Sequence, residues 1–280
     1  MEDSHIADLN IKKDTHLFGV FDGHGGKEVA QLVKKYFVKE LKANKSFIEN
    51  NMKKALQETF LRIDELCVMT QYMAELKELN KISKKEDSEI EKNQPKNVYS
   101  DLFGSMQQNN ENIALMTGCT ATVCLIHENK VYFANAGDSR IVISKNGVAI
   151  PMTVDHKPDL EEEKNRIYKA GGTVTDGRVN GNLNLSRSLG DLEYKQNKKM
   201  KPEQQIVTAF PDVTEEALQN IDMIILACDG VWDCKTNQEA VDFCSSKLKK
   251  GNKDGVKLST ILGNLMDECL ATDIMNGNFF

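Results

Sequence analysis

Strand-like runs of apolar residues alternate with apolar residues at helical spacing along this 280-residue chain. The short apolar run "HLFGVF" at 16–21 is rich in aromatic and β-branched residues and predicts a strand. Apolar residues then recur at helical spacing over 27–42, and a second helical pattern covers 52–76. The chain therefore opens with one strand followed by two long amphipathic helices.

Residues 118–152 contain several β-rich runs separated by turn residues, and Asn146-Gly147 is a strong hairpin signal. This pattern predicts an antiparallel meander. A helix should follow between Pro158 and Gly171, and the nearly continuous apolar run 221–228 predicts a central strand. Further helices are expected over 236–251, which opens with a capping box, and over 256–270. Strands in blocks flanked by helices favour an α+β fold, in which the antiparallel sheet system could form one layer or two.

Residues 77–112 differ from the rest of the chain because they are highly charged and poor in apolar positions. We interpret them as the end of a helix followed by a mobile surface insertion. A solvated loop without a function is the favoured reading of this segment.

Composition and charge narrow the choice of function. The net charge of −6 argues against electrostatic binding of nucleic acid, and no apolar run is long enough to span a membrane. Seven cysteines, an odd number without any C-x-x-C pair, fit a reduced compartment better than a disulfide framework or a zinc cluster. We expect a monomeric protein of the cytoplasm, with the nucleus as a second location.

Three aspartates stand at the ends of apolar runs, each next to a glycine: Asp22, Asp138 and Asp229. Any one of them alone is an ordinary turn residue. As a set, they predict that carboxylates meet at one edge of the sheet system, where they would repel one another unless divalent cations such as Mg²⁺ or Mn²⁺ neutralised them. Further candidate acids are Glu2, Asp3, Asp233 and Asp273.

His24 lies two residues after Asp22 in "FDGHGG". It has three readings: a turn residue, a metal ligand or a general acid. Its position on a glycine-rich loop beside the acids favours the general acid, because imidazole titrates in the range that such catalysis needs.

An ordered set of motifs resembles the type 2C, metal-dependent Ser/Thr protein phosphatases. The motifs span nearly the whole chain: "MED" at 1–3, "VFDGHGG" at 20–26, "GCTATV" at 118–123, "ANAGDSR" at 134–140, "DHKP" at 155–158, "AGGTV" at 170–174, "VNGNLNLSRSLGD" at 179–191 and "LACDGVWD" at 226–233. A single D-G-H-G would be a weak signal, but the ordered set is specific.

The resemblance implies a single catalytic domain over 1–280 with a β-sandwich of two antiparallel sheets flanked by α-helices, which makes four layers. It also implies hydrolysis of phosphoserine and phosphothreonine in proteins by a water activated between two Mg²⁺ or Mn²⁺ ions, without a phosphoenzyme. Phosphoproteins would then be the partners.

By the same resemblance, Asp22 bridges the two ions, Asp229 and Asp273 complete one site, and Glu2 and the Gly23 carbonyl serve the other. Asp138 and Asp233, with Asp229, match a third and weaker metal site. His24 matches the general acid, and residues 176–184 match a flap that influences substrate choice.

The chain departs from the family pattern at both ends. An arginine that usually precedes "MED" by three residues and contacts the substrate phosphate is not in this chain, and "ATDIMNGNFF" replaces Asp-Asn-Met-Ser/Thr and a last strand. The domain is therefore expected to be truncated at both ends. A phosphatase-like scaffold with little or no catalysis, and a fragment of an active enzyme, are the alternatives to an active phosphatase.

Overall fold

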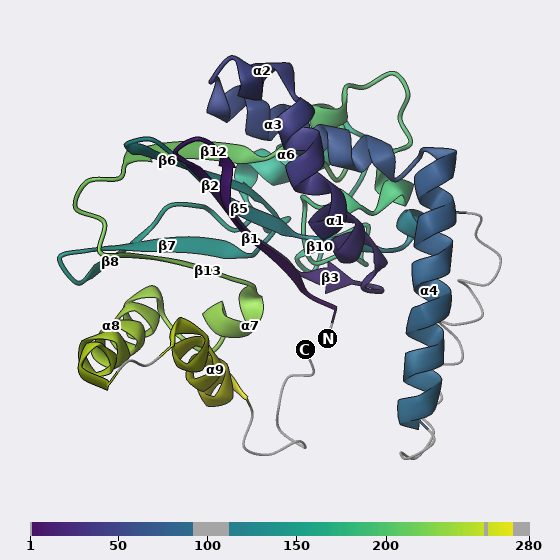
Figure 1. The fold of residues 1–280 in the computed structure, drawn as a ribbon. Helices are drawn as coiled ribbons and strands as arrows, with labels where there is room; N and C mark the ends of the chain where they lie inside the picture. The colour runs from purple at the N-terminus through teal and green to yellow at the C-terminus, as the bar shows by residue number, and fades with distance from the viewer. Residues whose placement is uncertain (1, 92–111, 255–256, 271–280) are drawn as a thin grey trace.

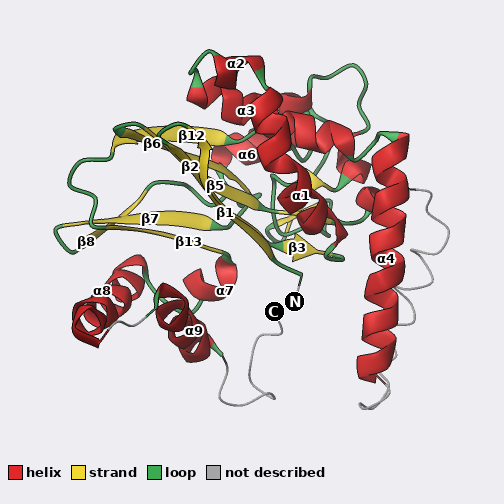
Figure 2. Cartoon of the chain, viewed as in Figure 1, coloured by secondary structure: helices red, strands yellow, loops and turns green. Residues whose placement is uncertain are grey.

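The computed structural model describes residues 2–91, 112–254 and 257–270. Two antiparallel sheets face each other, and helices cover the outer face of each sheet (Figure 1). The colouring by secondary structure in Figure 2 shows the same layers as helix, sheet, sheet and helix. The predicted α+β sandwich of four layers is confirmed.

The larger sheet has five strands in the order β1-β2-β5-β6-β12, and every neighbouring pair is antiparallel. Its strands are β1 (Ser4–Lys12), β2 (Thr15–Phe21), β5 (Ala121–His127), β6 (Lys130–Ala136) and β12 (Asp212–Ala217). The second sheet has the order β13-β7-β8, with β7 (Arg140–Lys145), β8 (Val148–Pro151) and β13 (Met223–Ala227).

Two minor sheets complete the strand system. One joins three two-residue strands in the order β11-β4-β3: β3 (Gly23–His24), β4 (Gly118–Cys119) and β11 (Leu189–Gly190). The other is the hairpin of β9 (Val174–Thr175) and β10 (Arg178–Val179). Asp176 and Gly177 form its turn, and both have a positive φ.

The helices lie in two groups. In the first group, α1 (Glu28–Ala43) and α3 (Met52–Leu66) pack on the larger sheet, α2 (Lys45–Ile48) contacts both of them, and α4 (Thr70–Glu91) lies beside α1 (Figure 1). Those next to the second sheet are α7 (Asp229–Trp232), α8 (Asn237–Asp254) and α9 (Leu258–Cys269), while α6 (Glu161–Lys169) follows β8 in the chain. None of the helices described is long and apolar enough to cross a membrane.

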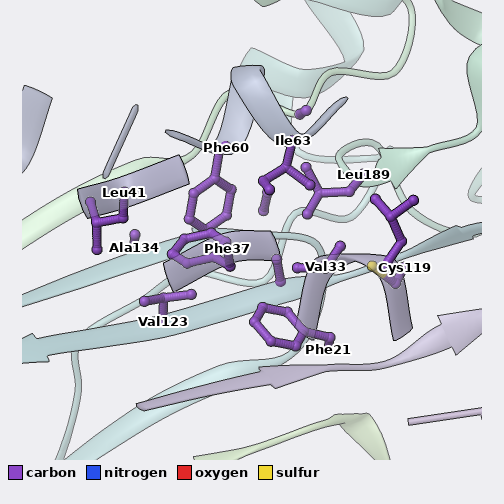
Figure 3. Close-up of a cluster of buried hydrophobic side chains, with 14 of the residues drawn as sticks. Phe21, Val33, Phe37, Leu41, Phe60, Ile63, Cys119, Val123, Ala134 and Leu189 are labelled. Carbon is purple, nitrogen blue, oxygen red and sulfur yellow. The ribbon is translucent and has the colours of Figure 1, made fainter. Parts of the chain in front are cut away.

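Alternate residues of each strand face different cores, as a period of two requires. Leu17 and Val123 of the larger sheet pack under α1 and α3, where Phe37 and Phe60 meet edge to face with their centroids 5.5 Å apart (Figure 3). Cys124, Val131, Phe133, Ile141 and Ile143 instead fill the space between the two sheets. The larger sheet is therefore packed on both faces, against α1 and α3 on one side and against the second sheet on the other.

The structure corrects three sequence predictions. The helical pattern over 52–76 is two helices, because Cys67 ends α3 and its carbonyl accepts a hydrogen bond from buried Asn112 Nδ2 at 3.1 Å. The meander is divided, since β5 and β6 belong to the larger sheet and β7 and β8 to the second. The run 221–228 gives β13, which stands at an edge of the described part of its sheet rather than in its centre.

The predicted insertion at 77–112 is helical over its first part. Residues up to Glu91 continue α4, because strong helix formers dominate there and Leu76 and Asn80 are buried against the body. The remainder, 92–111, lies outside the described residues, so its mobility stays a prediction.

Candidate active site

Strands from the two sheets deliver Asp22 and Asp229 to one place. Asp22 follows directly on β2, and its carbonyl accepts a hydrogen bond from the Thr120 N–H at 2.9 Å. Asp229 opens α7 just after β13. Asp22, Asp229 and Cys228 each have one ligand atom within 4.8 Å of the others. The ends of strands from two sheets therefore bring these side chains into a single cluster.

Asp138 joins this cluster from the turn after β6. Gly137 before it has a φ of 120° and packs against Thr120, so that a side chain at this position would be strained and obstructed. The Gly137 N–H donates to His156 Nδ1 at 3.2 Å, which fixes the turn. Asp138 itself is 2% exposed, and Lys157 Nζ donates to its Oδ2 at 2.5 Å. The sequence reasoning missed Lys157 as a partner of the cluster, although it belongs to the quoted "DHKP".

The carboxylates of the cluster repel one another. Burial raises the pKa of Asp22 well above its ordinary value, and the charges of Asp3, Asp229 and Asp138 raise it further. Burial also raises the pKa of Asp229, with further contributions from Asp138 and Asp233. Negative charge without enough compensation, on hard oxygen donors, fits Mg²⁺ or Mn²⁺.

Glu2 and Gly23 are in contact. A Cβ atom added to Gly23 would lie 2.6 Å from the Glu2 carbonyl oxygen, so only glycine permits this approach. Burial of the Glu2 carboxylate raises its pKa, whereas the hydrogen bond that it accepts from the Gly26 N–H lowers it. Burial outweighs that bond, and the charge of Glu28 adds to it, so the pKa of Glu2 is raised overall.

Asp233 lies at the end of α7, where its charge acts on both Asp229 and Arg140. Arg140 is held by two hydrogen bonds to Asp155, of 2.9 and 2.6 Å, and its guanidinium lies 5.4 Å from the Trp232 ring centroid. Asp233 therefore belongs to the same end of the sandwich. Asp273, the remaining predicted ligand, lies outside the described residues.

His24 and Asp191 form a close pair beside the cluster. His24 Nε2 lies 2.7 Å from Asp191 Oδ2, with 27% of the His24 side chain exposed but only 4% of the Asp191 side chain. The short sheet β11-β4-β3 creates this pair, since β3 ends at His24 and β11 ends just before Asp191. A side chain on Gly118 of the middle strand would collide with both residues.

Asp191 favours the protonated form of His24. Burial works against protonation of His24, but the charge and the hydrogen bond of Asp191 outweigh it, and the pKa of His24 is raised. The sequence reasoning missed Asp191. Its signal was the Gly-Asp pair at 190–191, which repeats the Gly-Asp pattern of the candidate acid Asp138.

Cys228 lies inside the cluster, with its Sγ 3.5 Å from Asp3 Oδ2. Burial raises the pKa of Cys228 to about 12, and the charges of Asp3 and Asp22 contribute. The thiol is therefore protonated at neutral pH and is a poor nucleophile. A thiol in this state does not serve as a catalytic nucleophile.

The chain matches the family model described as "Protein phosphatase 2C" over residues 1–80 and 69–276. It is 45% identical over 278 residues to "Probable protein phosphatase 2C 3" of Paramecium tetraurelia, covering 99% of this chain and 83% of that protein. It is 40% identical to "Probable protein phosphatase 2C 21" of Arabidopsis thaliana over 295 residues, covering 99% and 79%.

Solved structures share the fold. A phosphatase from a pathogenic strain of Toxoplasma gondii superimposes with a TM-score of 0.68 at 22% identity, covering 96% of this chain and 83% of that one. The serine-threonine phosphatase 2C of the same organism gives a TM-score of 0.68 at 19% identity, covering 95% and 84%.

Proposed function

Because this chain belongs to the protein phosphatase 2C family, whose members are protein-serine/threonine phosphatases, we propose that it hydrolyses phosphoserine and phosphothreonine in proteins with divalent cations. The observation that carries the proposal is the cluster of Asp22, Asp138 and Asp229 beside the His24–Asp191 pair. Acids that raise one another's pKa are costly to keep together unless cations bind between them.

Each acid has a proposed place in the metal centre. Asp22 would hold both principal ions, Asp229 and Asp273 would hold one of them, and Glu2 with the Gly23 carbonyl would hold the other. Asp138 and Asp233, with Asp229, would form a third and weaker site. When bound, the two principal ions activate a water for attack and neutralise charge on the phosphoryl group.

His24 acts as the general acid. Its Nε2–H is held by Asp191, so the proton for the leaving alkoxide comes from Nδ1. The raised pKa keeps the imidazole protonated to a higher pH than an isolated histidine, which suits an acid at neutral pH. Asp191 orients the ring and is a positioning residue.

The reaction needs no phosphoenzyme. The Cys228 thiol is protonated, and attack by water transfers the phosphoryl group in one step. We propose phosphoproteins as substrates for a monomeric enzyme of the cytoplasm or nucleus, with neither nucleic acid nor membrane as a partner.

A quenched-flow experiment with a ³²P-labelled phosphothreonine peptide and Mn²⁺ tests this mechanism. Acid quenching during turnover should release all label as inorganic phosphate and leave none on the protein. Label retained on the protein would contradict direct attack by water, and no release at any Mn²⁺ concentration would favour a non-catalytic scaffold.

A further inference from the structure

Glu28 is a buried carboxylate with one satisfied and one unsatisfied oxygen. It lies in the first turn of α1 and is 1% exposed. Its Oε1 accepts a hydrogen bond from Asn80 Nδ2 of α4 at 3.1 Å, whereas its Oε2 has no hydrogen-bond partner among the described residues. An unpaired buried carboxylate oxygen destabilises the folded state. Its presence here indicates that a hydrogen-bond donor or a cation from solution binds to it.

The unsatisfied oxygen points toward the glycine loop of the candidate active site. A Cβ atom on Gly26 would collide with Glu28 Oε2, and Gly26 has a φ of 145° that further favours glycine. The N–H of the same Gly26 donates to the Glu2 carboxylate. Glu2 and Glu28 therefore both contact Gly26, and they lie close enough for their charges to interact.

A purely structural role explains only half of this arrangement. A glutamate in the first turn of a helix interacts favourably with the helix dipole, and Asn80 satisfies Oε1. Neither interaction accounts for Oε2, which is buried against Gly26. A second acidic group so close to Glu2 raises the local negative charge that a cation can neutralise.

We propose that Glu28 is a further acidic residue of the divalent-cation site that contains Glu2 and the Gly23 carbonyl. Its Oε2 is positioned to accept hydrogen bonds from the hydration shell of that cation, and Asn80 fixes the carboxylate in this orientation. The inference rests on the proposed metal dependence. Because Asn80 lies on α4, it also assigns this helix a part in holding the metal centre.

Loss of the Glu28 charge should lower the affinity of the protein for Mn²⁺. Mutation of residues that hydrogen-bond to the ligands of a metal ion typically lowers the protein's affinity for that ion by about 10–100-fold. Glu28→Gln keeps the shape of the side chain and an oxygen for Asn80, but removes the negative charge. It should weaken the binding of one Mn²⁺ ion at least about tenfold, within that range.

Two measurements on the full chain test the inference: calorimetric titration with Mn²⁺, and melting temperature with and without Mn²⁺. The matched control is Glu161→Gln, because Glu161 is an exposed glutamate in the first turn of α6. Glu28→Gln should bind one Mn²⁺ more weakly and should gain less in melting temperature from Mn²⁺ than the wild type. In metal-free buffer it should melt at the same temperature or higher, since an unpaired buried charge is gone. The control should match the wild type throughout.

Other outcomes distinguish a failure of the role of Glu28 from a failure of the proposed function. Unchanged Mn²⁺ affinity in Glu28→Gln, or a melting temperature lowered equally with and without Mn²⁺, would overturn the role of Glu28 and leave the proposed function intact. Wild-type protein that binds no Mn²⁺ would overturn both. If Glu28→Gln does not fold, Asn80→Ala replaces it: weakened Mn²⁺ binding is expected, and wild-type binding would overturn the inference.

Discussion

The Nε2 atom of His24 lies 2.7 Å from Oδ2 of Asp191, although 167 residues separate them in the chain. Three strands of two residues each make this contact possible, with Gly118 of the middle strand leaving room for both side chains. Ser188 Oγ also donates to Asp191 Oδ2, at 2.5 Å. The imidazole is therefore oriented by a buried carboxylate that is itself held in place.

Replacing Asp191 by Asn should impair the general acid without removing it. Because the charge of Asp191 raises the pKa of His24, Asp191→Asn should lower that pKa. The alkaline limb of the kcat profile for a phosphothreonine peptide should then shift to lower pH, with kcat falling about tenfold to hundredfold, part of what a general acid contributes.

An aryl phosphate, whose leaving group needs little protonation, should be much less affected by Asp191→Asn. The exposed Asp14→Asn, in the turn between β1 and β2, is the control. Equal losses on both substrates would mean that Asp191 supports the fold and not the acid.

The metal-free protein should lose stability as the pH rises. The pKa of Asp22 is raised above its ordinary 3.8, so the folded state holds this proton at a pH where the unfolded chain has lost it. The free energy of unfolding must then fall between those two pKa values. Thermal melts in a chelator from pH 5 to 8 should show the decline, and Asp22→Asn should flatten it. Mn²⁺ favours the ionised form and should remove the decline in the wild type. A flat wild-type profile in the chelator would contradict the repulsion described for this cluster.

Lys157 should compete with a cation for Asp138. Its Nζ lies 2.5 Å from Asp138 Oδ2, in the place where positive charge is needed at the proposed third site. Lys157→Gln should therefore strengthen the weakest Mn²⁺ site by about tenfold, equivalent to roughly 1.4 kcal/mol. Mn²⁺ titration followed by electron paramagnetic resonance measures this, with the exposed Lys169→Gln as control. Weaker binding in Lys157→Gln would show instead that the lysine is needed to hold Asp138 in position.

Glu163 should make the fold sensitive to acid. Its carboxylate is 2% exposed and pairs with Arg187 Nη2 and Arg166 Nη1, both at 2.6 Å. Burial opposes ionisation, but the hydrogen bond of Arg187 and the charges of both arginines outweigh it and lower the pKa of Glu163 to about 2. Its contribution is therefore complete above the unfolded value of 4.5 and is lost as the pH falls toward 2.

Glu163→Gln should leave Arg187 with Asp212 as its remaining counter-charge and should remove the carboxylate that pairs with Arg166, and it should destabilise the protein by about 3–5 kcal/mol. Urea unfolding at pH 7 and pH 3 measures the difference, which should shrink at the lower pH. A difference that stays constant with pH would exclude the ion pairs as its cause.

Strong local periodicity explains what could be predicted from the sequence. The apolar spacing over 27–42 became α1, and the capping box at Thr236 and Glu239 became the start of α8, with the Glu239 carboxylate accepting from the Thr236 N–H at 2.8 Å. Both signals lie within a few residues of the structure they specify. The acids at the ends of strands could also be identified, because each follows its strand directly in the sequence.

What the sequence did not reveal depends on contacts between distant segments. The break between α3 and α4 is held by Asn112, 45 residues beyond Cys67. The passage of the chain from one sheet to the other after β6 is set by Gly137 packed on Thr120. The pairing of His24 with Asp191 needs the whole β11-β4-β3 sheet. The periodicity of apolar residues along the chain does not predict contacts between distant segments.

Metal-dependent catalysis is tested by the hydrolysis of a phosphothreonine peptide across Mn²⁺ and Mg²⁺ titrations, with Asp22→Asn as the matched variant. Turnover should rise with the cation concentration, should be abolished by a chelator and should be lost in Asp22→Asn, which should remain folded. Well-folded wild-type protein that shows no turnover at any cation concentration, or equal turnover in Asp22→Asn, would contradict it.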